Sequence, residues 1–127
     1  MRSQATQREQ FYNRGGDFTP SNYEPDFTMD GTAQSAAIAS GASRLRVNNQ
    51  GGTGEHIRIA FGATAAEAEE NLTITTGAAT TGHFIAANSN GNGTVSEDIG
   101  IPANAGFYAI ANAVAGDTQA VSVTQGV

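Results

Sequence analysis

The sequence predicts an all-β fold: a small antiparallel β-sandwich or jelly-roll-like barrel with an extended N-terminal arm. Three observations lead to this prediction. Apolar and polar residues alternate in several short runs, a pattern typical of half-buried strands. Gly, Asn and Pro separate these runs at intervals of about ten residues, as in sandwiches and barrels. No long stretch follows the helical period, and the 16 glycines among 127 residues lower helix propensity.

The first thirty residues form the predicted arm, and residues 31–127 form the predicted β-sandwich domain. The arm is polar and has no sustained apolar period, so it cannot form a core of its own. It nevertheless holds five of the nine aromatic residues of the chain. Residues 1–16 carry three arginines against one glutamate, a net charge of +2. This combination indicates a segment with separate anchoring side chains.

Aromatic and arginine side chains are the preferred anchors of protein interfaces. We therefore predict that the arm binds sister subunits or another partner. The predicted partner-binding residues are Arg2, Arg8, Phe11, Tyr12, Arg14, Phe18, Tyr23 and Phe27. The alternative is that the arm folds back over its own domain, since chain ends are ordered only where something holds them.

The clearest alternation lies in residues 43–48 and 55–61. In the first run Leu45 and Val47 share one face of a strand, and in the second run Ile57 and Ile59 do the same. A glycine-rich stretch, residues 49–54, separates the two runs. The pattern predicts an antiparallel hairpin.

The remaining elements are shorter. Residues 63–71 predict one or two helical turns, and residues 107–114 and 119–124 predict a closing hairpin. Further strands are predicted at 32–40, 72–76, 81–87 and 95–101, the last two joined by an Asn-Gly turn. The predicted core is thin and consists of Ile38, Leu45, Val47, Ile57, Ile59, Phe61, Leu72, Ile74, Phe84, Ile85, Ile99, Ile101, Phe107, Ile110, Val121 and Val123. So thin a core suggests that oligomerisation adds stability.

Composition and charge exclude several classes of protein. The chain has no cysteine and therefore no disulfide framework or thiolate metal site. Its net charge of −6 argues against nucleic acid as a partner. No run reaches the roughly 18 apolar residues of a membrane span, and the first residues lack the apolar stretch of a signal peptide. We expect a protein that is made in the cytoplasm and has no membrane partner.

Few residues suggest chemistry. The acidic group Glu67, Glu69 and Glu70 is typical of a solvated face, and His56 and His83 lack the spacing of a zinc site. The segment Asn88–Asp98 superficially resembles a calcium loop, but its twelfth position is Ile99 where that loop needs an acid. No nucleophile or phosphate-binding motif is present. We therefore expect no catalytic residues, no metal and no cofactor.

The stretch Arg44–Asn49, a glycine loop and Ile57–Gly62 read RLRVNN and IRIAFG, and the chain ends in a strand of the form VxVTxG at Val121–Gly126. These segments resemble small structural proteins of tailed-bacteriophage virions, of the capsid decoration or cement type. The resemblance covers roughly residues 32–126. It implies a compact β domain, often trimeric, on the exterior of a capsid. It also implies a terminal arm that clasps the major capsid protein or sister subunits.

The resemblance leaves other functions open. A head–tail or tail-associated structural protein would fit the long aromatic arm. A carbohydrate- or receptor-binding sandwich would need exposed aromatic side chains outside the arm. A polysaccharide hydrolase would need two carboxylates placed in a cleft. The sequence places its acids on the predicted surface, and we therefore expect a non-enzymatic protein.

Overall fold

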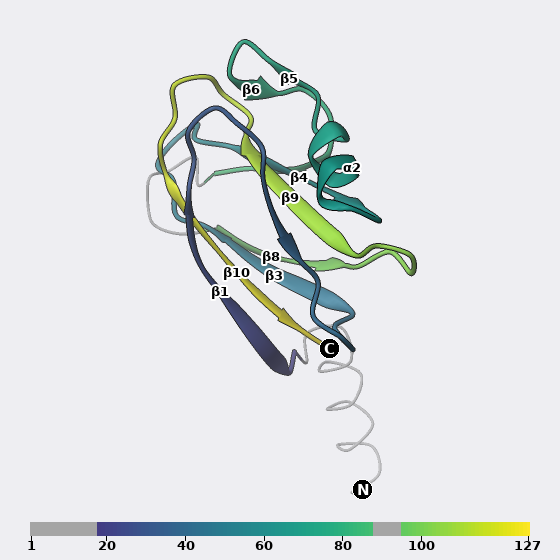
Figure 1. Ribbon diagram of the computed structural model, residues 1–127. Helices are drawn as coiled ribbons and strands as arrows, with labels where there is room; N and C mark the ends of the chain where they lie inside the picture. Colours follow the sequence, from purple (N-terminus) through teal and green to yellow (C-terminus); the bar gives the residue numbers. More distant parts are fainter. Residues whose placement is uncertain (1–17, 88–94) are drawn as a thin grey trace, which may run out of the picture.

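A computed structural model describes residues 18–87 and 95–127, which form two four-stranded antiparallel sheets packed face to face (Figure 1). The first sheet has the order β1 (Pro20–Thr28), β10 (Ala120–Gly126), β3 (Arg44–Asn49), β8 (Val95–Gly100). The second sheet has the order β2 (Gln34–Ala37), β9 (Phe107–Asn112), β4 (Ile57–Gly62), β7 (His83–Ile85). The all-β sandwich is confirmed, and within the described residues neither sheet closes into a barrel.

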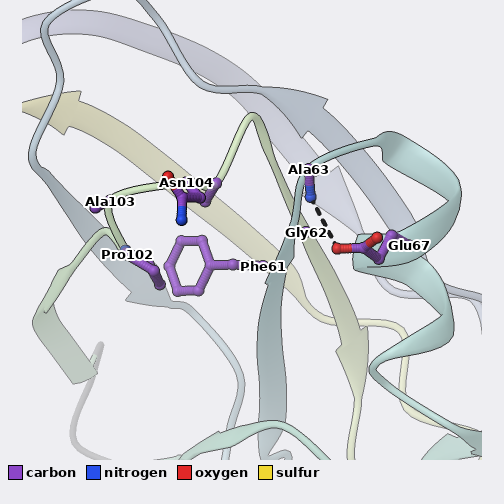
Figure 2. A pocket seen from close by; sticks show the side chains of 8 residues that line it. Phe61, Gly62, Ala63, Glu67, Pro102, Ala103 and Asn104 are labelled. Atoms are coloured by element: carbon purple, nitrogen blue, oxygen red, sulfur yellow. Dashed lines mark hydrogen bonds between the residues drawn. The ribbon is translucent and has the colours of Figure 1, made fainter.

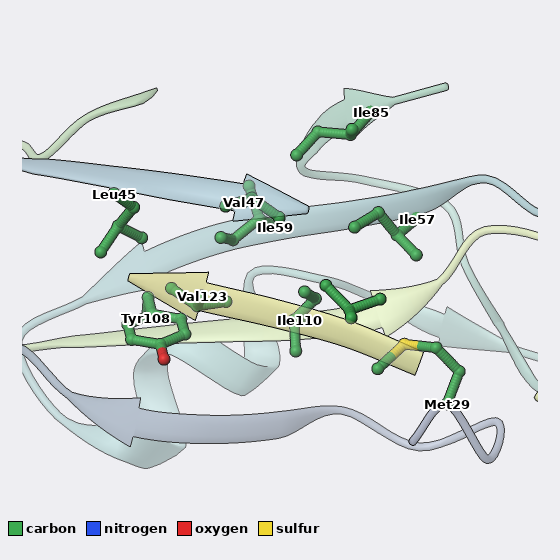
Figure 3. Close-up of a cluster of buried hydrophobic side chains, with 10 residues drawn as sticks. Met29, Leu45, Val47, Ile57, Ile59, Ile85, Tyr108, Ile110 and Val123 are labelled. Carbon is green, nitrogen blue, oxygen red and sulfur yellow. The ribbon is translucent and has the colours of Figure 1, made fainter. Parts of the chain in front are cut away.

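The main core lies between the two sheets (Figure 3). Leu45, Val47, Val121 and Val123 come from the first sheet. Ile57, Ile59, Ile85, Tyr108 and Ile110 come from the second sheet. Alternation explains this layer, because successive side chains of a strand point to opposite faces.

Most of the predicted core is buried or packed against the buried cluster. Two predicted members are exposed instead, Ile74 at 38% and Phe84 at 43%. Phe84 is flanked by His83 and buried Ile85 on β7, so it points to the face opposite Ile85. Met29 and Tyr108, both fully buried, complete the core and were not predicted.

Neither predicted hairpin is present in the structure. Strand β3 pairs with β10 and β8, whereas β4 pairs with β9 and β7, so the glycine-rich loop crosses from one sheet to the other. The connection from β9 to β10 crosses in the same way. An alternating pattern fixes which side chains face the core, but both sheets share that core. Alternation alone therefore does not identify the partner of a strand.

A small second core lies on the outer face of the second sheet. Helix α2 (Ala65–Glu70) and the two-stranded hairpin of β5 (Ile74–Thr75) and β6 (Ala78–Ala79) lie near this face (Figure 1). Ala68 and Leu72 pack there against alanines of β4 and β9. The helical turns predicted for residues 63–71 are confirmed. No helix in the described ranges could span a membrane.

Close approach of α2 to the sheet depends on Gly62. A Cβ atom at this position would lie 2.8 Å from the carbonyl carbon of Glu67 and would also collide with the backbone nitrogen of Ala68. Thr64 caps the helix by accepting a hydrogen bond from the Glu67 amide at 3.1 Å. Glu67 accepts a hydrogen bond from the amide of Ala63, the residue before the cap, at 3.1 Å, and so ties the entry of the helix to its first turn.

The sandwich begins at Pro20, earlier than the boundary predicted at residues 30 and 31. Strand β1 pairs with β10 along the edge of the first sheet. Phe27 packs edge-to-face on Tyr108, with ring centroids 6.1 Å apart, and Met29 is fully buried. Prolines are tolerated on edge strands, and the register of β1 shifts between Glu24 and Phe27. The C-terminal part of the predicted arm therefore belongs to the domain.

Candidate interaction surface at the base of the sandwich

The chain enters β1 beside its own C-terminus. The Thr19 amide donates to the Val127 carbonyl at 2.9 Å, and the Val127 amide donates to the Thr19 carbonyl at 3.1 Å. Ser43 joins the same end of the sandwich, because its amide donates to the Gly126 carbonyl and its carbonyl accepts from the Ile101 amide. We call this end the base; it lies where Figure 1 marks the C-terminus.

Phe18 is anchored at the base by two arginines of β3. The guanidinium carbon of Arg46 lies 4.5 Å from the centroid of the Phe18 ring, and that of Arg44 lies 5.5 Å away. Both distances suit a cation–π interaction. Gly126 makes room for the ring, since a Cβ there would lie 2.9 Å from Phe18 Cζ. The point at which residues 1–17 join the sandwich is thereby fixed.

Asp98 of β8 holds Arg46 in place. Nε of Arg46 donates to Oδ1 of Asp98 at 2.7 Å, and Nη2 donates to Oδ2 at 2.9 Å. These hydrogen bonds lower the pKa of the Asp98 carboxyl and raise the pKa of the guanidinium. A bidentate pair fixes the plane of the guanidinium whose carbon lies over the Phe18 ring. Asp98, at the end of the segment that superficially resembles a calcium loop, therefore has a structural role.

Tyr23 remains the most exposed large hydrophobic side chain of the described residues, at 60%. Its hydroxyl donates to Oδ1 of Asp26 at 2.8 Å, and this bond raises the pKa of the phenol. No described helix covers the first sheet in the way that α2 covers the second (Figure 1). Tyr23 is therefore free to contact a partner.

The predicted arm residues thus have different positions. Phe27 contributes to the core of its own domain, Phe18 stacks on the arginines of β3, and Tyr23 is exposed. The fold-back alternative therefore describes residues 18–30 better than binding to a partner does. The other predicted anchors, Arg2, Arg8, Phe11, Tyr12 and Arg14, lie outside the described residues.

A hollow of about 310 Å³ lies between the end of β4 and the loop from β8 to β9 (Figure 2). Its lining residues are Phe61, Gly62, Ala63, Glu67, Pro102, Ala103, Asn104 and Ala105. The ring of Phe61 and Pro102 supply apolar surface, and Asn104 and the carboxylate of Glu67 supply polar groups (Figure 2). The sequence did not predict this hollow, because Phe61 follows the same apolar–polar alternation as the core residues of its strand.

The two histidines and the nearby acids have structural partners. Nδ1 of His56 accepts from the Ala87 amide at 2.8 Å, and its ring packs on Phe84. Nε2 of His83 lies 2.5 Å from Oε2 of Glu97, which bridges the second sheet to the first. The described residues contain no group of three or more His, Cys, Asp or Glu that could hold a metal.

No family model, curated protein or solved structure matches this chain.

Proposed function

We propose that this chain is a non-enzymatic structural protein of a bacteriophage virion. It decorates the exterior of the capsid and stabilises the shell by binding where shell subunits of the major capsid protein meet. The N-terminal residues clasp neighbours, and the assembled form is a homotrimer. The sequence resemblance of Arg44–Asn49, Ile57–Gly62 and Val121–Gly126 supports this role.

The structural observation that carries the proposal is the fixed root of the N-terminal segment. Phe18 and Thr19 are held by Arg46 and Val127, so residues 1–17 start from a defined position on a folded domain. A clasp needs such a root, because strain on the segment must pass to the sandwich instead of unravelling β1. Many weak contacts of this kind, repeated over a lattice, act multivalently.

Labelling of purified virions tests the location. An antibody against the sandwich, detected by electron microscopy, is expected to label heads over their whole outer surface. The same virions digested to remove the head proteins give the background. Label confined to the tail or to the head–tail junction would overturn the decoration role and favour the head–tail alternative.

The exposed ring of Phe84 supports a second candidate, a carbohydrate-binding module, because exposed aromatic side chains stack on sugars. The guanidinium carbon of Arg58 lies 5.1 Å from the ring centroid, and His56 packs at 5.0 Å. These neighbours cover part of the ring, which remains 43% exposed. A glycan array that gave no signal with wild-type protein would remove this candidate.

A further inference from the structure

We propose that the hollow beside Phe61 receives residues 1–17 of a second copy of this chain. The aromatic pair Phe11 and Tyr12 occupies the hollow, and the arginines of the segment lie against the glutamates of α2. The inference rests on the proposed function, because it names the neighbour that the N-terminal segment clasps and the site that receives it.

The hollow is already formed in the single chain. The Ala105 amide donates to the Pro102 carbonyl at 3.1 Å, and the Gly106 amide donates to the Gly62 carbonyl at 2.9 Å. Gly106 lies so close to β4 that a Cβ there would be 2.8 Å from the Ala63 carbonyl oxygen. These contacts fix the loop before anything binds. Binding of a side chain therefore loses little free energy to ordering of the loop.

The size and lining of the hollow fit an aromatic side chain. Phe61 packs one part of its ring on the core and is only partly buried. Pro102 and Asn104 lie beside the ring, and Ala103 lines the same hollow (Figure 2). Aromatic rings seated in apolar pockets are the usual energetic centres of protein interfaces.

Helix α2 carries three carboxylates without a cationic partner among the described residues, and one of them, Glu67, lines the hollow. The salt bridges of those residues are Arg46–Asp98 and His83–Glu97. Glu67 accepts from a backbone amide, and Glu69 accepts from the Ser35 hydroxyl at 2.6 Å. The last turn of α2 contains Glu70 and no basic residue, which opposes the helix dipole. A basic segment would offset this unfavourable charge.

The arginines of the sandwich are already committed. Arg46 holds Asp98, Arg44 donates to the Val127 carbonyl at 3.0 Å, and Arg58 donates to the Gly82 carbonyl at 2.8 Å. The three remaining arginines of the chain lie in residues 1–17. Arg8 and Arg14 flank the aromatic pair at two or three residues on either side. Each arginine is therefore at most roughly 10 Å of extended chain from the aromatic pair. This distance is close to the length of a six-residue helix such as α2.

The proposed clasping role favours a second copy over the same chain. Phe18 lies over the β3 arginines, whose side chains alternate with the inward Leu45 and Val47 and so point away from the core. Helix α2 lies beyond the opposite sheet (Figure 1). The hollow lies at the same end of the sandwich as the root, because its loop follows Ile101, whose amide donates to the Ser43 carbonyl at the base. The segment is long enough for either hollow, and a clasp between subunits assigns it to the hollow of a neighbour. Seventeen residues span at most about 60 Å.

Disulfide trapping tests the proposal cleanly, because the chain has no cysteine. Full-length Tyr12→Cys is mixed with full-length Ala103→Cys and oxidised in the absence of any shell. The matched control pairs Tyr12→Cys with Ala115→Cys, which is also exposed but lies in the loop from β9 to β10 at the other end of the sandwich. We expect at least a fivefold higher yield of the 12–103 heterodimer than of the 12–115 heterodimer.

A second arm tests the charge contacts. Glu67→Gln combined with Glu70→Gln in the Ala103→Cys chain is expected to lower the 12–103 yield at least twofold. Equal yields for 12–103 and 12–115 would overturn the proposal. So would a 12–103 disulfide that forms within the double variant but not between mixed single variants. Because no capsid is present, these outcomes are independent of where the antibody labels the virion.

Discussion

Arg46 and Phe18 form the contact that fixes the start of the described chain, with the guanidinium carbon 4.5 Å from the ring centroid. Asp98 orients the guanidinium from the other side through two hydrogen bonds. Three side chains from β8, β3 and the entry to β1 thereby connect the N-terminal segment to the first sheet. Force on that segment is transmitted to the interior of the sheet.

Phe18→Ala is expected to lower the free energy of unfolding by about 1 kcal/mol, because it removes the cation–π contacts and exposes the base. Urea denaturation followed by circular dichroism measures the change. Tyr23→Ala is the matched control, since Tyr23 is exposed, and its effect should stay within about 0.5 kcal/mol. Equal effects of the two substitutions would contradict the anchoring role of Phe18.

Asp98→Asn is expected to lower stability at pH 7 by about 0.5 kcal/mol after solvent screening. The hydrogen bonds from Arg46 lower the pKa of Asp98 in the folded protein. Its contribution is therefore present above the unfolded pKa of about 4 and is lost as the pH falls through the folded pKa. The melting temperatures of wild type and variant should converge as the pH falls below the unfolded pKa. A difference that stays constant on acidification would speak against the ion pair.

Asp117→Asn is expected to behave in the opposite way. Burial, together with the nearby charge of Glu55, raises the pKa of Asp117, and its Oδ2 atom is buried without a hydrogen-bond partner. A raised folded pKa favours the folded state below the unfolded pKa, and this contribution is lost as the pH rises through the folded pKa. The variant should therefore melt at the same or a higher temperature than wild type at pH 7. A clear loss of stability at pH 7 would refute this reading.

Gly62→Ala is expected to cost about 1–3 kcal/mol, because its Cβ collides with the backbone of α2. Gly100→Ala is the matched control: a Cβ at Gly100 on edge strand β8 has nothing within 4 Å. Its effect should stay within about 0.5 kcal/mol. Chemical denaturation of both variants makes the comparison. A tolerant Gly62 would mean that α2 packs less closely than the structure has it.

The alternating runs were sufficient to predict the inward faces of β3 and β4, where Leu45, Val47, Ile57 and Ile59 are all buried. They could not predict which strands pair, because both strands face one shared core. The loop between them can connect strands of two different sheets as well as two neighbours in one sheet. The exposed Phe84 was a different error. It neighbours Ile85 on one strand, so the two side chains cannot both point inward.

The sequence predicted only part of the arrangement at the base of the sandwich. Alternation placed Arg44 and Arg46 on the outward face of their strand. Nothing local connected them to Phe18 or to Asp98, which is 52 residues from Arg46 along the chain. Such contacts depend on strand order and register, which alternation does not specify. Strand β1 was hidden by Pro20 and Pro25, residues that an edge strand tolerates.

The mass of the native assembly tests the central claim, that the N-terminal segment clasps neighbouring copies. Native mass spectrometry would compare the full chain with a chain that begins at Phe18, which keeps the anchored root and all of β1. We predict that the full chain is a trimer and that the shortened chain is a folded monomer. A full-length monomer, or a trimer that survives the shortening, would contradict the account.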